Sequence, residues 1–279
     1  MLCYLFNVLK ITSLSALILF VIGCGEPLPS QDQIQKVDPL INKYLKPVVL
    51  DGCDMKRFGD SNDGGYLLCA EFLNGISAAY SYGIEGRDNL GCEVANTLNI
   101  TVHQYDPFDI RRPACNNGKT VFHEEGIAHK AFVDDDHRKF DTLENHIRAN
   151  QDTGKQILVK MDVEGAEWES LLNASEATLE NIQQLTLELH WLYKEENFAV
   201  IENTLKKLSQ HFYVVHIHTN NHRCGRGGRF LSDTFEVTYV NKNLPGLIVK
   251  DEVAPLPHPL DAACNHRYLK CDLSGDLFN

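Results

Sequence analysis

Short apolar runs alternate along the chain with segments in which apolar residues recur at helical spacing. The runs predict strands at 78–82, 100–105, 120–123, 157–163, 185–192, 212–217 and 235–240. The periodic segments predict helices at 89–98, 141–149, 168–179 and 198–208. This alternation is typical of parallel strands joined by crossover helices, so we expect an α/β fold. Upstream, the Asn62–Gly65 turn separates two strand-like pieces and indicates a hairpin.

The stretch from Gln156 to Trp168 is the clearest strand–turn–helix unit in the chain. Its apolar run lacks a clean alternation, which is typical of a strand buried on both faces. Ligands of open α/β sheets bind at the carboxyl ends of strands. We therefore interpret Asp162, at the tip of this strand, as a functional residue. Glu167 and Glu169 follow where a helix begins, and the helix dipole explains acids there.

A second unit has the features of an adenosine pocket. The strand at 78–82 ends in the glycine turn Gly83–Gly86, and the next strand ends at Asp106. Glycine lets a ligand approach the backbone, and an acid at the second strand can accept ribose hydroxyls. The chain has no GxGxxG sequence, so the pattern favours a nucleoside without a pyrophosphate, such as S-adenosylmethionine.

Three motifs resemble those of class I S-adenosylmethionine-dependent methyltransferases of the FkbM type, namely AYSYGIEG, VHQYDPFD and LVKMDVEGAEW. A fourth, RFGDSNDGGYLLCAEF, is similar to a related methyltransferase-like group whose animal members carry an N-terminal anchor. The resemblance spans roughly Cys53 to Val240. It implies a Rossmann-like, seven-stranded, mostly parallel sheet with helices on both faces and an antiparallel last strand. It also implies S-adenosyl-L-methionine as the cofactor and a hydroxyl, often on a sugar or natural product, as the methyl acceptor.

By position, the resemblance assigns cofactor contacts. Gly83 and Glu85 would line the methionine end of the cofactor, and Asp106 would bind the ribose. Phe108 would flank the adenine, and Asp162 would face the site of methyl transfer. We predict a methyltransferase domain at 51–245.

An alcohol acceptor needs a base within hydrogen-bond reach. The candidates at or near carboxyl ends of predicted strands are Asp162, Glu188, His190 and His218. The candidate acceptor contacts are Glu164, His218, Asn220 and Asn221. Strand alternation places Glu188 and His190 on one face. With Asp162 these two residues form a set that a divalent metal can use, but we predict no metal because acids gather at strand ends for other reasons.

The N-terminal residues 1–24 predict a signal peptide or a short membrane anchor. Their apolar core is short for a bilayer span, and Val21–Cys24 matches the bacterial lipobox, in which Cys24 would be lipidated. We interpret 25–50 as a tether with a short amphipathic helix and 246–279 as an irregular tail. These segments predict a membrane-anchored or secretory-pathway protein.

Seven cysteines follow Cys24, which is an odd number, so at least one should stay free or pair between chains. A bridge from Cys264 to Cys271 or Cys224 is one option for this tail. The chain has no CxxC pair, which argues against zinc.

The net charge of −12 argues against a nucleic-acid partner. It is compatible with a small-molecule or glycan acceptor. Two alternatives remain open from the residues: a non-catalytic surface domain that binds carbohydrate in the same crevice, and a Rossmann enzyme with another nucleotide cofactor. Export also conflicts with the cytosolic origin of S-adenosylmethionine, unless a lumen is supplied with it or the domain stays inside.

Overall fold

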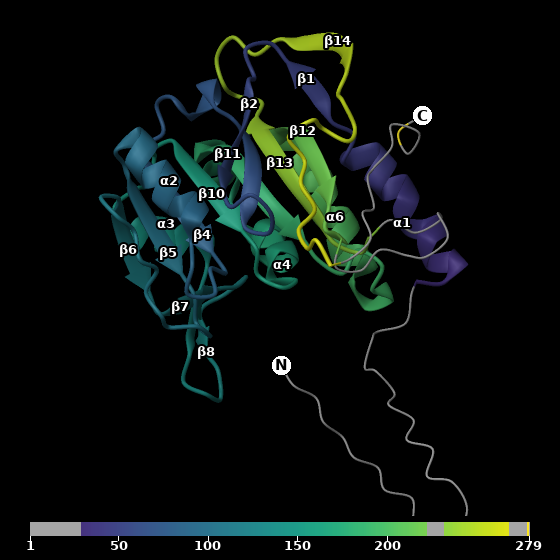
Figure 1. Cartoon of the computed structure of the whole chain (residues 1–279). Helices are drawn as coiled ribbons and strands as arrows, with labels where there is room; N and C mark the ends of the chain where they lie inside the picture. Colours follow the sequence, from purple (N-terminus) through teal and green to yellow (C-terminus); the bar gives the residue numbers. More distant parts are fainter. Residues whose placement is uncertain (1–28, 222–231, 268–277, 279) are drawn as a thin grey trace, which may run out of the picture.

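A seven-stranded sheet flanked by helices forms the centre of the molecule (Figure 1). The computed structural model describes residues 29–221, 232–267 and 278, so the predicted leader at 1–24 lies outside the described residues. The strand order is β12-β13-β11-β10-β4-β5-β6. All neighbours pair in parallel except β13, which is antiparallel to both β11 and β12. The predicted fold class and its antiparallel last strand are confirmed.

The strands of this sheet coincide closely with the apolar runs of the sequence. They are β4 (Ala78–Tyr82), β5 (Thr101–Tyr105), β6 (Lys119–His123), β10 (Ile157–Met161), β11 (Ile182–Leu189), β12 (Phe212–Thr219) and β13 (Phe235–Asn241). The main difference is β11, which begins and ends three residues before the predicted 185–192. As a result, His190 lies just after the strand.

Strand alternation divides the core into two layers. On one face, Tyr80, Val159 and Leu187 pack with helices α1 (Gln31–Tyr44), α3 (Leu143–Ala149), α4 (Ala166–Asn173), α5 (Glu176–Asn181) and α6 (Phe198–His211). On the other face, Ala79 and Leu158 pack against α2 (Asn89–Leu98) and the hairpin of β2 (Met55–Gly59) and β3 (Gly65–Cys69). Helices therefore cover both faces, as predicted. The predicted helix at 168–179 is two helices, because Ala174 is extended and Ser175 caps α5.

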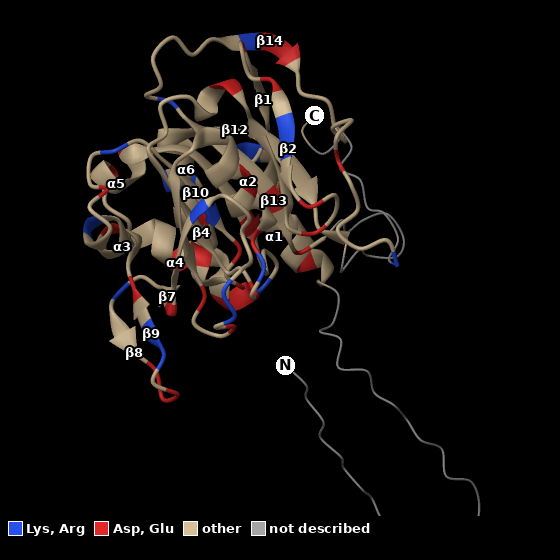
Figure 2. Ribbon diagram, turned by 60° about the vertical axis from the view of Figure 1, so that its left-hand side comes forward, with Lys and Arg blue, Asp and Glu red and all other residues tan. Residues whose placement is uncertain are grey.

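A small three-stranded sheet follows β6 and is made of β7 (Glu125–Ile127), β8 (Phe132–Val133) and β9 (Lys139–Asp141). The β8–β9 turn projects away from the main body (Figure 2). Arg138 pairs with Asp134 and Asp136 in this turn. The charge cluster at 134–136 is therefore a local turn structure.

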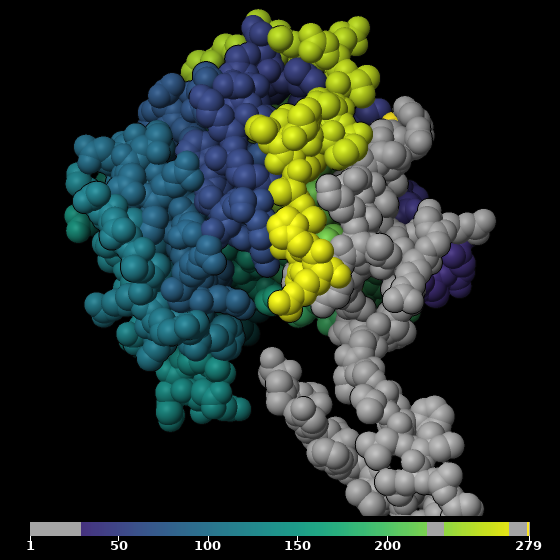
Figure 3. Space-filling view, viewed as in Figure 1, coloured from purple at the N-terminus to yellow at the C-terminus, as the bar shows by residue number. Residues whose placement is uncertain are grey.

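The segments outside the predicted domain contribute to the fold. Helix α1 buries Val37 and Ile41 in the main core, so the segment predicted as a tether packs on the domain. Strand β1 (Val48–Leu50) pairs with β14 (Val249–Val253) from the predicted irregular tail. The rest of the C-terminal segment, yellow in Figure 3, lies beside the hairpin, and Arg57 donates to the Leu260 carbonyl there.

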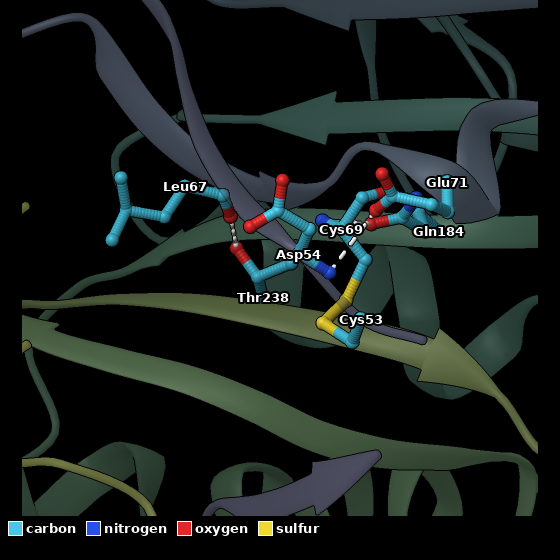
Figure 4. The surroundings of a disulfide bond; sticks show 7 residues. All are labelled: Cys53, Asp54, Leu67, Cys69, Glu71, Gln184 and Thr238. Carbon is cyan, nitrogen blue, oxygen red and sulfur yellow. Dashed lines mark hydrogen bonds between the residues drawn. A yellow bond between two sulfur atoms is a disulfide. The ribbon is translucent and has the colours of Figure 1, made fainter. Parts of the chain in front are cut away.

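A disulfide closes the β2–β3 hairpin, between Cys53 and Cys69 (Figure 4). The 3₁₀ helix η1 (Glu71–Leu73) follows it, and a second 3₁₀ helix, η2 (Glu195–Asn197), precedes α6. The side chain of Gln184 on β11 bonds the Cys69 backbone in both directions, at 3.0 and 2.8 Å, which seats the hairpin on the sheet. Cys264 is a buried free thiol here, and Cys224 and Cys271, the partners considered for it, lie outside the described residues.

Within the described ranges, no helix is both long and apolar enough to cross a bilayer.

Candidate functional site

A pocket of about 1190 Å³ opens at the carboxyl edge of the sheet. It lies where β4 and β10 are neighbours. The strand that follows β4 in the chain, β5, lies on one side of this pair, and the strand that follows β10, β11, lies on the other side. This is the topological switch point at which open α/β sheets bind ligands. Residues after β4, β5, β10 and β11 line it, including Gly83, Asp106, Asp162 and His190. The pocket therefore brings together the two units that the sequence singled out.

The turn after β4 requires glycine at position 83. Gly83 has a φ of +69°, and a Cβ there would lie 1.6 Å from the carbonyl oxygen of Asp162. Gly83 donates its N–H to the Tyr105 carbonyl, while Asp162 donates its own to the Tyr82 carbonyl. The backbones that follow β4, β5 and β10 are thus joined at this point, and Gly83 and Glu85 both line the pocket as predicted.

Asp106 organises the two loops beside this turn. One carboxylate oxygen accepts the N–H groups of Ile84 and Glu85, at 3.1 and 2.8 Å. The other accepts those of Phe108 and Asp109, both at 2.9 Å. A carboxylate has about four lone-pair positions, and all four are used here. In this conformation Asp106 shapes the pocket wall, and ribose binding by its oxygens, which stays a prediction, would require replacing one of these bonds.

Phe108 lies at the rim of the pocket and is 69 % exposed. Its ring is tilted against Phe140, and the Arg138 guanidinium lies 4.6 Å from its centroid. An exposed aromatic face at this place is available to a planar ligand, which is compatible with the predicted adenine contact.

At the other end of the pocket, Asp162 lies among three polar side chains. Its Oδ2 lies 3.4 Å from both the Lys160 ammonium and the Tyr66 hydroxyl, and its Oδ1 lies 3.7 Å from His190 Nε2. Lys160 is buried and also donates to the Tyr82 and Gly83 carbonyls. Lys160 therefore links the glycine turn at Gly83 to the carboxylate of Asp162.

The imidazole ring of His190 is buried among carboxylates that lie 3.4–3.8 Å from its nitrogens. Its Nε2 lies 3.7 Å from Asp162 Oδ1, 3.8 Å from Glu164 and 3.7 Å from Glu188. Its Nδ1 lies 3.4 Å from Glu167 Oε1 but is not aligned for a hydrogen bond. Burial alone would lower the pKa of His190, but the carboxylates, Glu167 foremost, raise its pKa to about 10. At neutral pH the ring is therefore an imidazolium.

The favourable interaction with the helix dipole is not the whole role of Glu167, because its side chain also holds two backbone N–H groups. It is fully buried, and its carboxylate accepts the N–H groups of Gly165 and His190, at 2.8 and 2.7 Å. Trp168 Nε1 donates to the His190 carbonyl at 2.9 Å. The start of α4 thus fixes the residue that follows β11 and positions the imidazole.

Glu188 and Asn220 close this end. Asn220 donates to Glu188 Oε1 at 2.7 Å, and both line the pocket. Burial, with Asp162 nearby, raises the pKa of Glu188 well above its usual value. Glu164 lies at the mouth, largely exposed, with a pKa raised by partial burial. Glu188 and His190 lie 3.7 Å apart at this end, and their catalytic role stays a prediction.

Two predicted site residues lie elsewhere. His218 and Asn221 do not line the pocket. The His218 ring approaches Asp261 instead, at 3.6 Å, and Asn221 exchanges two hydrogen bonds with the backbone of Asn265. Both side chains are used to attach the C-terminal segment to the end of β12. Their position does not support the predicted catalytic or acceptor-binding role of this pair, which stays a prediction.

Acidic residues dominate the pocket lining. Ten Asp or Glu residues line it, against the four positively charged residues Arg87, Arg111, Lys160 and His190. Figure 2 shows acidic residues gathered near β4 and α4 at this edge of the sheet. Arg87 and Arg111 are themselves paired with Asp60 and Asp109. The pocket therefore favours cationic or neutral ligands.

Lys160 and Tyr66 are site residues that the sequence analysis did not select. Lys160 could be recognised as the one charged residue within an otherwise apolar strand. Tyr66 follows the glycine pair of the hairpin, and only the folding of that hairpin over the sheet brings its hydroxyl to Asp162.

Comparison with known proteins adds little to this geometry. Neither the protein-family models nor the curated proteins match this sequence. Among solved structures, the chain is similar to the crystal structure of the methyltransferase FkbM from Methylobacillus flagellatus KT, with 16 % identity and a TM-score of 0.38. The alignment covers 60 % of this chain and 44 % of that one, which is less than half of its length. A likeness at this level carries no conclusion about function.

Proposed function

We propose that this protein is an S-adenosylmethionine-dependent methyltransferase that methylates a hydroxyl group of an uncharged glycan or other polyhydroxyl molecule. The proposal depends on one observation: the Gly83–Asp106 loops and the Asp162–His190 cluster line the same pocket. This pocket lies at the switch point between β4 and β10. One end of the pocket is shaped by backbone, and the other presents titratable side chains. The motif resemblance found in the sequence supports the same assignment.

The Gly83–Asp106 end fits a nucleoside with a positively charged centre. A side chain at position 83 would collide with the Asp162 backbone, so the wall there consists of peptide groups. The described lining contains no cluster of unpaired basic residues that would bind a pyrophosphate. S-adenosylmethionine, when bound, supplies a methyl group on a sulfonium, and the acidic lining favours such a cation.

The Asp162 end provides a proton acceptor for the methylated hydroxyl. The acceptor oxygen gains the methyl group and loses its proton, and a carboxylate within hydrogen-bond reach takes that proton. We assign this role to Asp162, because His190 is already protonated at neutral pH. His190 and Lys160 stabilise the carboxylate from either side and orient it toward the pocket.

The charge of the pocket restricts the acceptor. Near Asp162, the carboxylates of Glu164 and Glu188 and the amide of Asn220 can bind neighbouring hydroxyls of a polyol. A phosphate, sulfate or carboxylate on the acceptor would meet several acids with few basic partners. We therefore expect neutral sugars and polyols to be preferred over anionic ones.

The compartment forms part of the proposal. The N-terminal leader predicted from the sequence and the Cys53–Cys69 disulfide both suit an oxidising, extracytoplasmic compartment reached by a secreted or membrane-anchored protein. Mass spectrometry of the mature N-terminus from cells tests this directly, because cleavage, lipidation of Cys24 or retention of the leader give different masses.

Two measurements test the function. Calorimetric titration with S-adenosylmethionine is expected to show saturable binding, which a carbohydrate-binding surface domain would lack. Transfer of a labelled methyl group to an array of free neutral glycans is expected to succeed, with acidic glycans as the comparison. Binding of the cofactor without transfer to any glycan would keep the enzyme class and reject this acceptor class.

A further inference from the structure

A second cluster of polar side chains lies in the core beside the pocket, beneath the C-terminal segment. It consists of His218 on β12, Glu236 on β13 and Cys264 in the C-terminal segment, all buried. His218 and Glu236 are paired across the two antiparallel strands. None of the three lines the pocket, but the cluster adjoins it, because a Glu236 oxygen lies within 4.8 Å of the carboxylates of Asp63 and Glu188, which do line it.

The ligand atoms of the three residues are close enough to bind one ion. A ring nitrogen of His218, Cys264 Sγ and a Glu236 oxygen all lie within 4.8 Å of one another, and Cys264 Sγ lies 3.2 Å from Glu236 Oε1. Around a tetrahedral zinc ion with bonds of about 2.0–2.3 Å, ligand atoms are separated by roughly 3.3–3.6 Å. Small side-chain adjustments would therefore suffice.

The imidazole of His218 gives an independent indication of a ligand. Its Nε2 is buried and has no hydrogen-bond partner among the described residues. Its Nδ1 faces Asp261 at 3.6 Å, and Asp261 is fixed by His216 Nε2 at 2.8 Å and by the His258 N–H at 2.7 Å. Metal-binding histidines commonly present one nitrogen to the ion and the other to a carboxylate. This arrangement would explain the buried Nε2.

We propose that His218, Glu236 and Cys264 bind a Zn²⁺ ion that fastens the C-terminal segment to β12 and β13. Thiolate and imidazole ligands favour zinc over magnesium or calcium, which prefer oxygen. Binding replaces the thiol proton of Cys264, which is released to solvent, by a sulfur–zinc bond. A water molecule completes the fourth position of such three-ligand sites. The absence of a CxxC pair is no obstacle, because the ligands come from three separate segments.

The proposal is tested on the full chain with zinc itself. Metal analysis after dialysis is expected to give one Zn²⁺ per chain for the wild type, and Co²⁺ substitution is expected to give a thiolate-to-cobalt absorption band. Cys264→Ser should abolish that band and the stoichiometric zinc. Asp261→Asn, which alters the carboxylate facing His218, should weaken zinc binding by about 10- to 100-fold.

Two matched controls locate the ion. Cys92→Ser removes a free cysteine elsewhere and should leave the zinc content unchanged. The described residues contain two other sets of potential ligands, namely Asp162, Glu188 and His190, and Asp63, Glu188 and Glu236. His190→Gln tests the first of these and should also leave the zinc content unchanged. A wild-type chain without stoichiometric zinc, or loss of zinc in His190→Gln but not in Cys264→Ser, would overturn the proposal.

A measurement without variants covers the case in which Cys264→Ser does not fold. Zinc added to the chelator-treated wild type is expected to raise its melting temperature, because an ion bound only by the folded state stabilises it. Magnesium at the same concentration should have no effect. An unchanged melting temperature with zinc would contradict the proposal.

Discussion

The two ends of the pocket differ in how their polar groups are satisfied. At the Gly83–Asp106 end, four backbone N–H groups bond one buried carboxylate at 2.8–3.1 Å. At the Asp162–His190 end, the charged side chains lie 3.4–3.8 Å apart and form few hydrogen bonds with one another. A saturated network makes a rigid wall that can position a ligand, whereas loosely paired charges can exchange a proton or accept a new partner. We therefore infer that the Gly83–Asp106 end binds the cofactor and that the Asp162–His190 end takes part in the reaction.

The largest effect is expected at the loosely paired end. Asp162→Asn removes the proposed proton acceptor while keeping its shape, and should lower kcat by roughly 100- to 10,000-fold. The affinity for S-adenosylmethionine should stay close to that of the wild type. Labelled methyl transfer to neutral glycans and calorimetry measure the two quantities. Glu252→Gln, on the remote strand β14, is the control. Equal rates in both variants would remove Asp162 from the mechanism.

At the rigid end, Gly83→Ala should reduce stability by at least about 2 kcal/mol, because overpacking and a left-handed backbone both cost energy. The added Cβ would lie 1.6 Å from the Asp162 carbonyl oxygen. Gly154→Ala is the matched control, since Gly154 has a φ of +77° but nothing within 4 Å of its Cβ position. Thermal or urea unfolding gives both values. Similar losses would mean that the backbone conformation, and not the close approach, determines the cost.

Asp106→Asn tests whether this carboxylate shapes the wall. An amide offers one accepting oxygen and places two donors near N–H groups, so we expect a loss of about 1–3 kcal/mol in stability. S-adenosylmethionine should bind more weakly as well. Asp109→Asn weakens the ion pair with the exposed Arg111 side chain but keeps an oxygen that can accept the Arg111 N–H, so it should change the stability by less than about 1 kcal/mol. Weaker cofactor binding in Asp106→Asn with unchanged stability would point to direct ribose contact alone.

A pH dependence of stability is also expected from His190. Folding raises the pKa of His190 from 6.5 to about 10. Its contribution to the free energy of unfolding is therefore complete below pH 6.5 and declines as the pH rises toward 10. Asp162, Glu164, Glu167 and Glu188 face this ring and favour its charged form. His190→Gln should remove this part of the slope. Urea unfolding of both proteins across this range measures it, and parallel curves would contradict the assignment.

The sheet could be predicted because its strands are marked by their own sequence. The runs at 78–82 and 157–161 are apolar and bounded by turn residues, so local pattern was sufficient. Helix α1 was recognised by its spacing, but its packing on the core depends on contacts with α6 and η2 that no local pattern specifies. The pairing of β14 with β1 was missed for the same reason.

The site was predicted in part. Gly83, Asp106, Asp162 and His190 follow parallel strands and Glu188 lies at the end of β11, so the topology brings them to one edge. Tyr66 depends on how the hairpin folds over that edge. The position of His218 was not anticipated, because its ring lies under the C-terminal segment and faces Asp261, although Asn220, which follows the same strand, lines the pocket. That long-range contact with Asp261 cannot be read from the residues around His218.

Calorimetric titration of S-adenosylmethionine into the wild type and Asp162→Asn tests the central claim most directly. The account predicts saturable binding at one site per chain for both proteins, because the wall shaped by Gly83 and Asp106 is unchanged in the variant. Absence of binding heat in a wild-type protein that melts cooperatively would contradict it.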